Sequence, residues 1–171
     1  MHRTRAFTLV ELVVAISIVA ILVAFTVPPL LTSLQNSAAN ALGNSLVLSL
    51  NLARSEAVKR AATVSLCAAA DATLSSCATN DAWTYGWLVF ADVTGDGLYT
   101  AGNDTLLKTD TIPSGSTLSG AFNSITFTSG GFVNNATALV FTATASGCVN
   151  NNALTITVRN PGEIISTPAP C

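Results

Sequence analysis

The stretch Ala6-Phe7-Thr8-Leu9-Val10-Glu11, continued by an apolar run from Leu12 to Phe25, decides how the chain is organised. The fourteen residues of the run carry no charge, and Ser17 is their only polar member. With its apolar flanks the stretch reaches about twenty residues, the length that an α-helix needs to cross a bilayer. We therefore expect a membrane-spanning helix over residues 7–27.

One acidic residue, Glu11, lies near the start of this apolar stretch. A carboxylate in hydrocarbon costs at least about 2.5 kcal/mol, so an intramembrane acid is a candidate functional residue. The short leader before it carries Arg3 and Arg5, and such basic residues favour the cytoplasmic side of a membrane. An ordinary secretory signal peptide fits less well, because residues 23–28 offer only a weak cleavage site.

A short basic leader, a small residue, the sequence Phe-Thr-Leu-Val-Glu and an apolar helix together resemble the class III leader of type IV pilins and type II secretion pseudopilins. The resemblance implies that a prepilin peptidase cuts between Ala6 and Phe7 and that Phe7 is then N-methylated. Ala6 stands where the family usually has Gly. Glu11 is then expected to face the amino terminus of a neighbouring subunit during assembly, because an ammonium and a carboxylate neutralise each other when paired.

A proline at the twenty-second mature position is also common in such pilins, and Pro28 takes that place when counting starts at Phe7. We expect a bend or local melting there rather than a stop, because helical periodicity resumes beyond Pro29. Apolar residues at three- and four-residue steps predict an amphipathic helix over residues 28–62. They are Leu30, Leu31, Leu34, Ala38, Ala41, Leu42, Leu46, Leu50, Ala53 and Ala57.

From residue 63 the pattern changes to short β-type segments separated by turns rich in Gly and Asn. Strands are expected at residues 63–67, 86–91, 106–109, 124–128, 131–133, 138–144 and 153–159. The expected fold class is α+β. Its long N-terminal helix has an apolar transmembrane half and an amphipathic second half. That second half packs against an antiparallel β-rich periplasmic domain over residues 63–171, and residues 1–6 form the leader.

Two further stretches extend the resemblance beyond the leader. Leu-Ala-Arg-Ser-Glu-Ala-Val-Lys-Arg at residues 52–60 and Gly-Trp-Leu-Val-Phe-Ala-Asp at residues 86–92 are similar to stretches of the GspH/FimT (FimT/FimU-like) group of minor pilins and pseudopilins. Residues 124–127 with Gly131-Phe132 resemble a third. The group implies a pilin fold with two small sheets. The expected function is that of a minor pilin in a type IV pilus, with a minor pseudopilin of a type II secretion system as the alternative.

The resemblance also implies where the protein is found and what it meets. The expected partners are other pilin or pseudopilin subunits, the prepilin peptidase and the inner membrane. Before assembly the chain is expected to be a single-pass inner-membrane protein with a periplasmic domain. After assembly it is expected in a pilus or pseudopilus filament.

Four cysteines, an even number, suggest disulfides in an exported chain. Four cysteines allow three connectivities, and we favour the sequential one, Cys67–Cys77 with Cys148–Cys171. A zinc site is the alternative, but no Cys-x-x-Cys pair exists and the only histidine, His2, lies in the leader. No metal is therefore expected at the cysteines.

Composition argues against catalysis and against nucleic-acid binding. Without a histidine beyond the leader, a Ser-His-Asp or Cys-His arrangement cannot form, so we expect neither an enzyme nor a cofactor. After cleavage, five basic residues face nine acidic ones, whereas DNA binding needs a basic patch. Some FimT-like members carry a Gly-Arg-x-Arg motif linked to DNA uptake. The matching residues 160–165 here lack both arginines, so DNA is an unlikely partner.

The sequence Asp92-Val93-Thr94-Gly95-Asp96-Gly97 partly resembles a calcium loop, with Asp92 and Asp96 as candidate ligands. Asn103 stands where the bidentate Glu of such a loop belongs. A plain β-turn is therefore the favoured interpretation, and a weak calcium site is the alternative.

Overall fold

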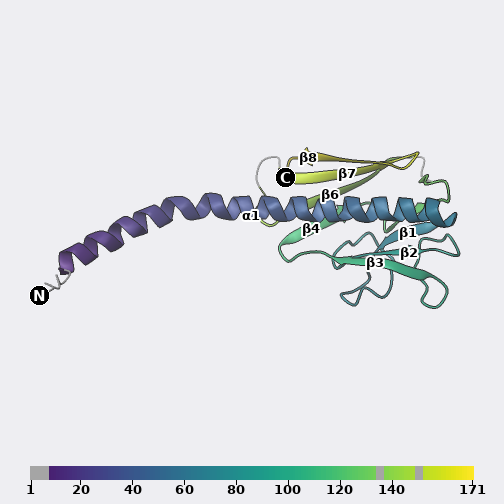
Figure 1. Ribbon diagram of the computed structural model, residues 1–171, viewed down its shortest axis with the longest axis horizontal. Helices are drawn as coiled ribbons and strands as arrows, with labels where there is room; N and C mark the ends of the chain where they lie inside the picture. The colour runs from purple at the N-terminus through teal and green to yellow at the C-terminus, as the bar shows by residue number, and fades with distance from the viewer. Residues whose placement is uncertain (1–7, 134–136, 149–151) are drawn as a thin grey trace, which may run out of the picture. The chain divides into compact units, whose positions relative to one another are not determined.

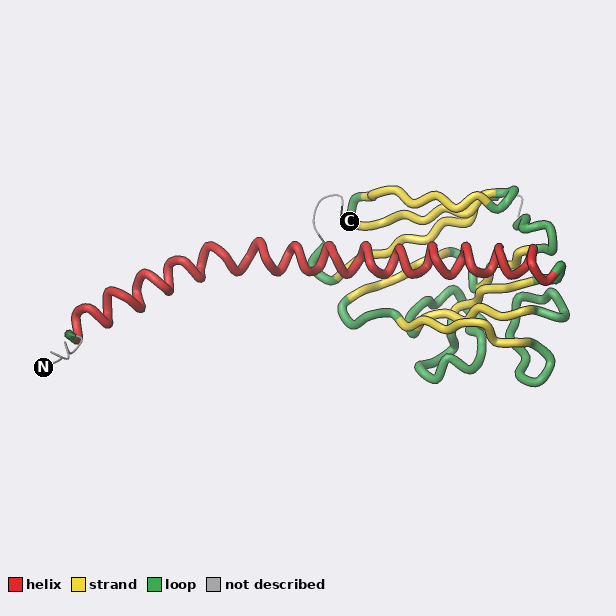
Figure 2. The backbone as a smooth tube through the Cα atoms, in the orientation of Figure 1, coloured by secondary structure: helices red, strands yellow, loops and turns green. Residues whose placement is uncertain are grey.

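The computed structural model describes residues 8–133, 137–148 and 152–171, apart from the side chains of residues 24–36. Within this description a helix is followed by strands (Figures 1 and 2). The chain divides into two compact units, Met1–Leu34 and Gln35–Cys171. The elements are α1 (Leu9–Arg60), β1 (Val64–Ala68), β2 (Gly86–Ala91), β3 (Thr105–Thr111), β4 (Ser116–Gly120), β5 (Ser124–Phe127), β6 (Leu139–Ala145), β7 (Ala153–Arg159) and β8 (Glu163–Ala169).

Helix α1 ends two residues before the expected limit, at a Schellman motif. The N–H of Ala62 donates to the carbonyl of Ala57, and the N–H of Ala61 donates to that of Val58, both at 3.2 Å. Ala61 has a φ of 50°, the left-handed conformation that this motif requires. These two bonds satisfy carbonyls that lack partners within the helix and turn the chain toward β1.

The second half of α1 buries one face, as the periodicity predicts. Leu42, Leu46, Leu50, Ala53 and Ala57 are all buried in the core. Two residues expected on the buried face are not buried: Ala41 is exposed and Ala38 is only half-buried. Three small residues that the pattern did not mark, Ala39, Gly43 and Ser49, are buried as well. Their small volumes let the strands approach the helix closely.

One antiparallel sheet has the strand order β3-β2-β1-β5 and is covered on both faces. The face toward α1 joins the helix in the main core. Its core residues are Val64, Leu66, Ala68, Trp87, Val89, Ile125 and Phe127. The opposite face forms a second cluster of Cys67, Ala69, Leu88 and Phe90, against which Leu74, Cys77 and Tyr99 pack. The strand expected at residues 63–67 is confirmed as β1, and both of its faces are buried because connecting loops cover the outer face.

The other antiparallel sheet has the strand order β4-β6-β7-β8 and contributes its apolar face to the same main core. Its central strands β6 and β7 alternate between buried and more exposed residues, as a sheet covered on one face should. This sheet contains both strands that the sequence pattern missed, β4 and β8, and both are edge strands. The two sheets together confirm the expected α+β class with two small sheets.

The expected strand at residues 131–133 is wrong. Within it, Val133 makes only an isolated bridge to Phe127. The chain turns back at residues 128–132, where Gly131 donates to the Thr128 carbonyl at 2.8 Å and Thr128 donates to the Phe132 carbonyl at 2.9 Å. Gly131 has a φ of +75°, which a strand does not use.

Candidate assembly surface

The N-terminal part of α1 presents a long apolar surface. Every large apolar side chain from Leu9 to Val23 is exposed, with exposed fractions between 48 % and 78 %. Ser17 is the polar residue within this run, and its hydroxyl donates to the Val13 carbonyl at 2.7 Å, so it is satisfied inside the helix. Soluble monomers rarely expose contiguous apolar patches beyond a few hundred Å². This surface therefore calls for an apolar environment.

Thr8 caps the start of α1, and Glu11 follows it by three residues. The N–H of Glu11 donates to Thr8 Oγ1 at 3.2 Å, and the N–H of Leu12 donates to the Thr8 carbonyl at 3.2 Å. Thr8 and Glu11 thus occupy the first and fourth positions of a capping-box sequence, in which a Glu or Gln is favoured three residues after the cap. Glu11 also places negative charge in the first turn, where the helix dipole favours it. Sequence reasoning had not assigned Glu11 this local role.

The other expected N-terminal sites are only partly described. Ala6 and Phe7, the expected cleavage and methylation sites, lie outside the described residues. At Pro28 and Pro29 the backbone is helical, so the expected local melting does not occur, while the bend stays a prediction. Among the residues that the structure describes, no helix is long and apolar enough to span a membrane. Of the expected membrane-spanning stretch 7–27, residue 7 and the side chains of residues 24–27 lie outside this description.

Both disulfides have the pairing that the sequence favoured. Cys67 is bonded to Cys77 with 5.7 Å between Cα atoms, and Cys148 to Cys171 with 5.8 Å. The first bond holds the β1–β2 connection against the outer face of β1. Cys77 Sγ also accepts from the N–H of Tyr99 at 3.0 Å, which ties the β2–β3 connection to the same place. The second bond fastens the chain after β8 to the segment that follows β6.

The carboxylate of Asp92 is buried and organises the β2–β3 loop. It accepts hydrogen bonds from the N–H groups of Gly95 and Gly97 at 2.6 and 2.8 Å. It also accepts from the hydroxyls of Ser65 and Thr94 at 2.7 and 3.2 Å. Four donors from the chain therefore occupy this carboxylate, which is the arrangement of a self-contained turn.

The second calcium candidate, Asp96, points elsewhere. Its carboxylate accepts from the N–H of Leu98 at 2.8 Å, as in an Asx-turn. A different acid, Asp104, helps Asp92 to fix the loop, because it accepts from the N–H groups of Val93 and Thr100 at 3.0 and 2.7 Å. Among the described residues, no three His, Cys, Asp or Glu side chains gather as metal ligands would. The turn geometry thus offers no further support for a calcium site.

A polar network joins the buried face of α1 to β3. Asp110 accepts hydrogen bonds from the hydroxyls of Ser45 and Ser49 at 2.8 and 3.2 Å, and it forms an ion pair with Lys108 at 2.7 Å. Lys108 in turn donates to Ser49 at 3.0 Å. Burial opposes ionisation of Asp110, but the hydrogen bonds and charge of Lys108 and the two serines outweigh it and lower the pKa of this carboxyl. The network compensates for Ser49, a hydroxyl buried within the helix face.

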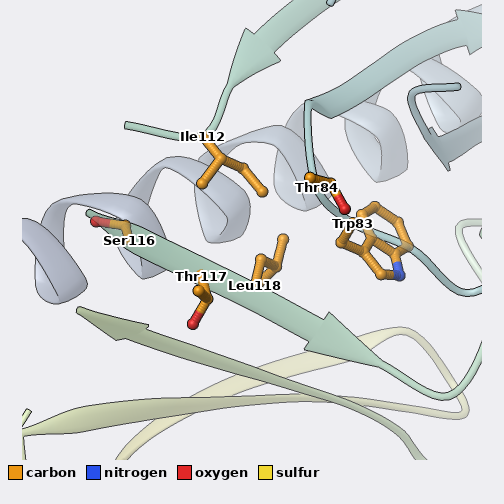
Figure 3. Close-up of a pocket in the computed structure, with 6 residues that line it drawn as sticks. All are labelled: Trp83, Thr84, Ile112, Ser116, Thr117 and Leu118. Atoms are coloured by element: carbon orange, nitrogen blue, oxygen red, sulfur yellow. The ribbon is translucent and has the colours of Figure 1, made fainter. Parts of the chain in front are cut away.

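A small pocket lies beside β4, at the connection that follows β3 (Figure 3). Its volume is about 140 Å³, and it is lined by Trp83, Thr84, Ile112, Ser116, Thr117 and Leu118. In Figure 3 the side chains of Ile112 and Leu118 extend toward each other, with the indole of Trp83 beside them. The lining contains no acid, base or thiol, so it offers hydroxyls and apolar contacts rather than acid–base chemistry.

Two of the three stretches that carry the family resemblance beyond the leader meet in space. Arg54 in α1 donates through Nε to the carbonyl of Gly131 at 3.1 Å. Gly162, in the β7–β8 turn, packs against that same carbonyl and against the Arg54 side chain. Where the DNA-uptake motif is expected to place arginines, the chain has the exposed Glu163, which pairs in register with Arg159 across the turn. The buried Gly162 here therefore closes a turn rather than displaying arginines.

Two protein families match parts of the chain. The family described as type II transport protein GspH matches residues 42–162, and the prokaryotic N-terminal methylation motif matches residues 1–27. Among curated proteins, none matches the chain.

Two kinds of solved structure have a similar fold. The type IV minor pilin FimU of Pseudomonas aeruginosa has a TM-score of 0.55 and 23 % identity, with 80 % of this chain and 90 % of that chain covered. The minor pseudopilin EpsH from the type 2 secretion system of Vibrio cholerae has a TM-score of 0.53 and 16 % identity, covering 76 % of this chain and 96 % of that chain. The GspH match extends over more than half of the residues of this chain, so the chain belongs to the GspH family of minor pilins and pseudopilins.

Proposed function

We propose that this protein is a minor pilin that is incorporated into a type IV pilus or primes its assembly. The family implies a membrane-anchored protein that later joins a filament. The observation that carries the proposal is the exposed apolar surface of α1 from Leu9 to Val23, with the single acid Glu11 in its first turn. Such a surface suits lipid before assembly and the helices of other subunits afterwards.

The proposed sequence of events begins at the leader. A prepilin peptidase cleaves between Ala6 and Phe7, and Phe7 is N-methylated. The chain waits as a single-pass inner-membrane protein with residues 28–171 in the periplasm. On entering the filament, Glu11 pairs with the amino terminus of a neighbouring subunit, so that neither charge remains alone in an apolar environment. The role is structural, and no step calls for a cofactor or for catalysis by this chain.

The second candidate function is that of a minor pseudopilin in a type II secretion system. The description of the matched family favours it, because that family is named for type II transport. The exposed helix serves both functions equally, since both filaments are built by burying such helices against each other. DNA reception stays disfavoured, because Glu163 occupies the region where basic residues are needed.

The role of Glu11 is tested by comparing Glu11→Ala with Glu11→Gln in cells that make the filament. Gln can replace Glu in a capping box but carries no charge. If charge pairing drives assembly, both variants are processed and reach the membrane fraction, yet both are depleted from sheared filaments. Glu163→Ala, which removes an exposed acid far along the chain, should assemble normally. Normal incorporation of Glu11→Gln would show that charge pairing is not needed for assembly. Only the capping role of residue 11 would then remain.

The type of filament is tested by deleting the gene and scoring surface piliation and protein secretion in the same strain. Loss of pili with intact secretion supports the pilin. Loss of secretion with intact pili would assign the chain to the secretion system instead.

A further inference from the structure

The loop between β5 and β6 is fastened to the C-terminal part of α1. Arg54 Nε donates to the Gly131 carbonyl at 3.1 Å. Gly131 lies so close to the helix that a Cβ there would be 2.9 Å from Val58 Cγ2 and 3.4 Å from Arg54 Cγ. Only glycine fits this position, and Phe132 is the next residue along the loop.

The β7–β8 turn, which belongs to the other sheet, packs against the same contact between Arg54 and Gly131. A Cβ on Gly162 would collide with the Gly131 carbonyl and would lie 3.2 Å from Arg54 Nε. The Arg54 side chain is therefore held by a hydrogen bond on one segment and by packing against another. Holding a long side chain in place before binding removes part of the entropy that binding would otherwise cost.

Two apolar residues that adjoin this contact along the chain have exposed side chains: Val58, one helical turn after Arg54, and Phe132, directly after Gly131. Val58 is 53 % exposed and Phe132 is 52 % exposed, although both lie on well-packed backbone. We call Arg54, Val58 and Phe132 the basic–apolar patch. Aromatic residues and arginine are the types that most often dominate the binding energy of protein interfaces. Val58 and Phe132 belong to neither core cluster, so packing of the core does not account for an apolar residue at these positions.

The charges around the patch differ from those elsewhere on the globular unit. Residues 54–60 and 159–163 contain four basic and two acidic side chains. Two of the basic ones, Arg60 and Lys59, share Glu56 at 2.6 and 3.2 Å. Residues 63–158 between these segments contain six aspartates and one lysine. The patch is therefore a net positive area on an otherwise acidic unit, and it complements a negative partner.

We propose that the basic–apolar patch docks an acidic loop with aliphatic side chains on the neighbouring subunit of the filament. The proposal rests on the assembly function given above. A carboxylate on the partner would pair with the guanidinium of Arg54, whose Nε is already held by the Gly131 carbonyl. Aliphatic side chains next to it would cover Val58 and Phe132 and exclude water from the ion pair.

The test places the photocrosslinker p-benzoylphenylalanine at position 132 of the full-length protein in filament-producing cells. The matched control places it at position 106, because Leu106 is also an exposed apolar residue, at 42 %, but lies on β3. We expect a crosslink from position 132 whose attached peptide contains an acidic residue next to aliphatic ones and comes from another pilin subunit. Attachment to a second copy of this chain, to nucleic acid or to lipid would overturn the proposal, as would the absence of a crosslink specific to position 132.

A pair of substitutions supplies a second, independent measure. Phe132→Glu places a negative charge on the patch, and Leu106→Glu makes the same change on β3. We expect Phe132→Glu to lower incorporation into filaments at least about tenfold, with processing and membrane insertion unchanged. Leu106→Glu should assemble like the wild type. Equal incorporation of the two variants would refute the docking site, whereas absence of the wild-type chain from sheared filaments would instead refute the proposed function.

Discussion

Gly43 is the position where a single methyl group tests the packing of α1 on the sheets. It lies within the helix and is buried, on the face toward β7. A Cβ at this position would overlap Leu154 Cδ2 and would lie 3.3 Å from Leu154 Cβ and Cγ. Leu154 is itself 8 % exposed and belongs to the main core, so it has little room to withdraw.

The expected effect of Gly43→Ala is the difference between two opposing terms. Replacing a helical glycine by alanine normally stabilises a helix by about 1 kcal/mol. Overpacking a filled core costs about 1–3 kcal/mol. Because the clash involves three atoms of one side chain, we expect the packing cost to prevail, with a net loss of about 1 kcal/mol in the free energy of unfolding.

Urea unfolding of residues 35–171 measures this loss directly. In a Leu154→Ala background the space is open, so Gly43→Ala should instead stabilise by about 1 kcal/mol, giving a coupling energy of about 2 kcal/mol. Asn40→Ala, on the exposed face of the same helix, is the control for helix propensity and should be mildly stabilising. If Gly43→Ala stabilises the protein as much in the wild type as in the Leu154→Ala background, the close-approach argument is refuted.

Three further predictions concern the carboxylates of Asp110, which is half-buried, and Asp92, which is buried. Asp110→Asn should lower the urea midpoint at pH 7. Since the folded state lowers the pKa of Asp110, its stabilisation is present above the unfolded-state pKa of about 3.9 and is lost as pH falls through the folded value. The two proteins should therefore converge in acid, and a constant difference down to pH 2 would contradict this. Asp92→Ala should cost at least about 2 kcal/mol by urea unfolding, because the N–H groups of Gly95 and Gly97 lose their acceptor. Millimolar calcium should leave the wild-type Tm unchanged, since four donors of the chain already occupy this carboxylate, and a rise in Tm would revive the calcium site.

Local sequence signals predicted the central strands well. β2 and β7 have the expected bounds, because each is a dense run of apolar and β-branched residues that holds its own register. The sequence pattern did not predict the edge strands β4 and β8. Ser116–Gly120 is rich in Ser and Gly, and Glu163–Ala169 includes Pro168, which only an edge strand tolerates. Their strand structure depends on pairing with β6 and β7 rather than on their own composition.

The candidate sites also divide into those that a local segment predicts and those that depend on distant contacts. The methylation motif, the apolar helix and Glu11 follow from the first residues alone, because cleavage signals, helix length and a misplaced charge are all properties of a local segment. The cap formed by Thr8 was also available from the Thr-x-x-Glu spacing, which is a sequence-level signal. By contrast, nothing local links Arg54 to Gly131 and Gly162, which are 77 or more residues further along the chain.

By itself, the sequence determined that this protein has an N-terminal methylation motif, one long helix whose first part is apolar, and a disulfide-bonded β-rich unit. Periodicity and charge spacing encode these features within a few turns of chain. Only the tertiary structure decided that both faces of β1 are buried, that Asp92 serves a turn, and that Arg54 is held against Gly131 and Gly162. Each of those depends on contacts between distant segments, where the close approach permitted by a glycine or a loop folded over a sheet sets the environment of a side chain.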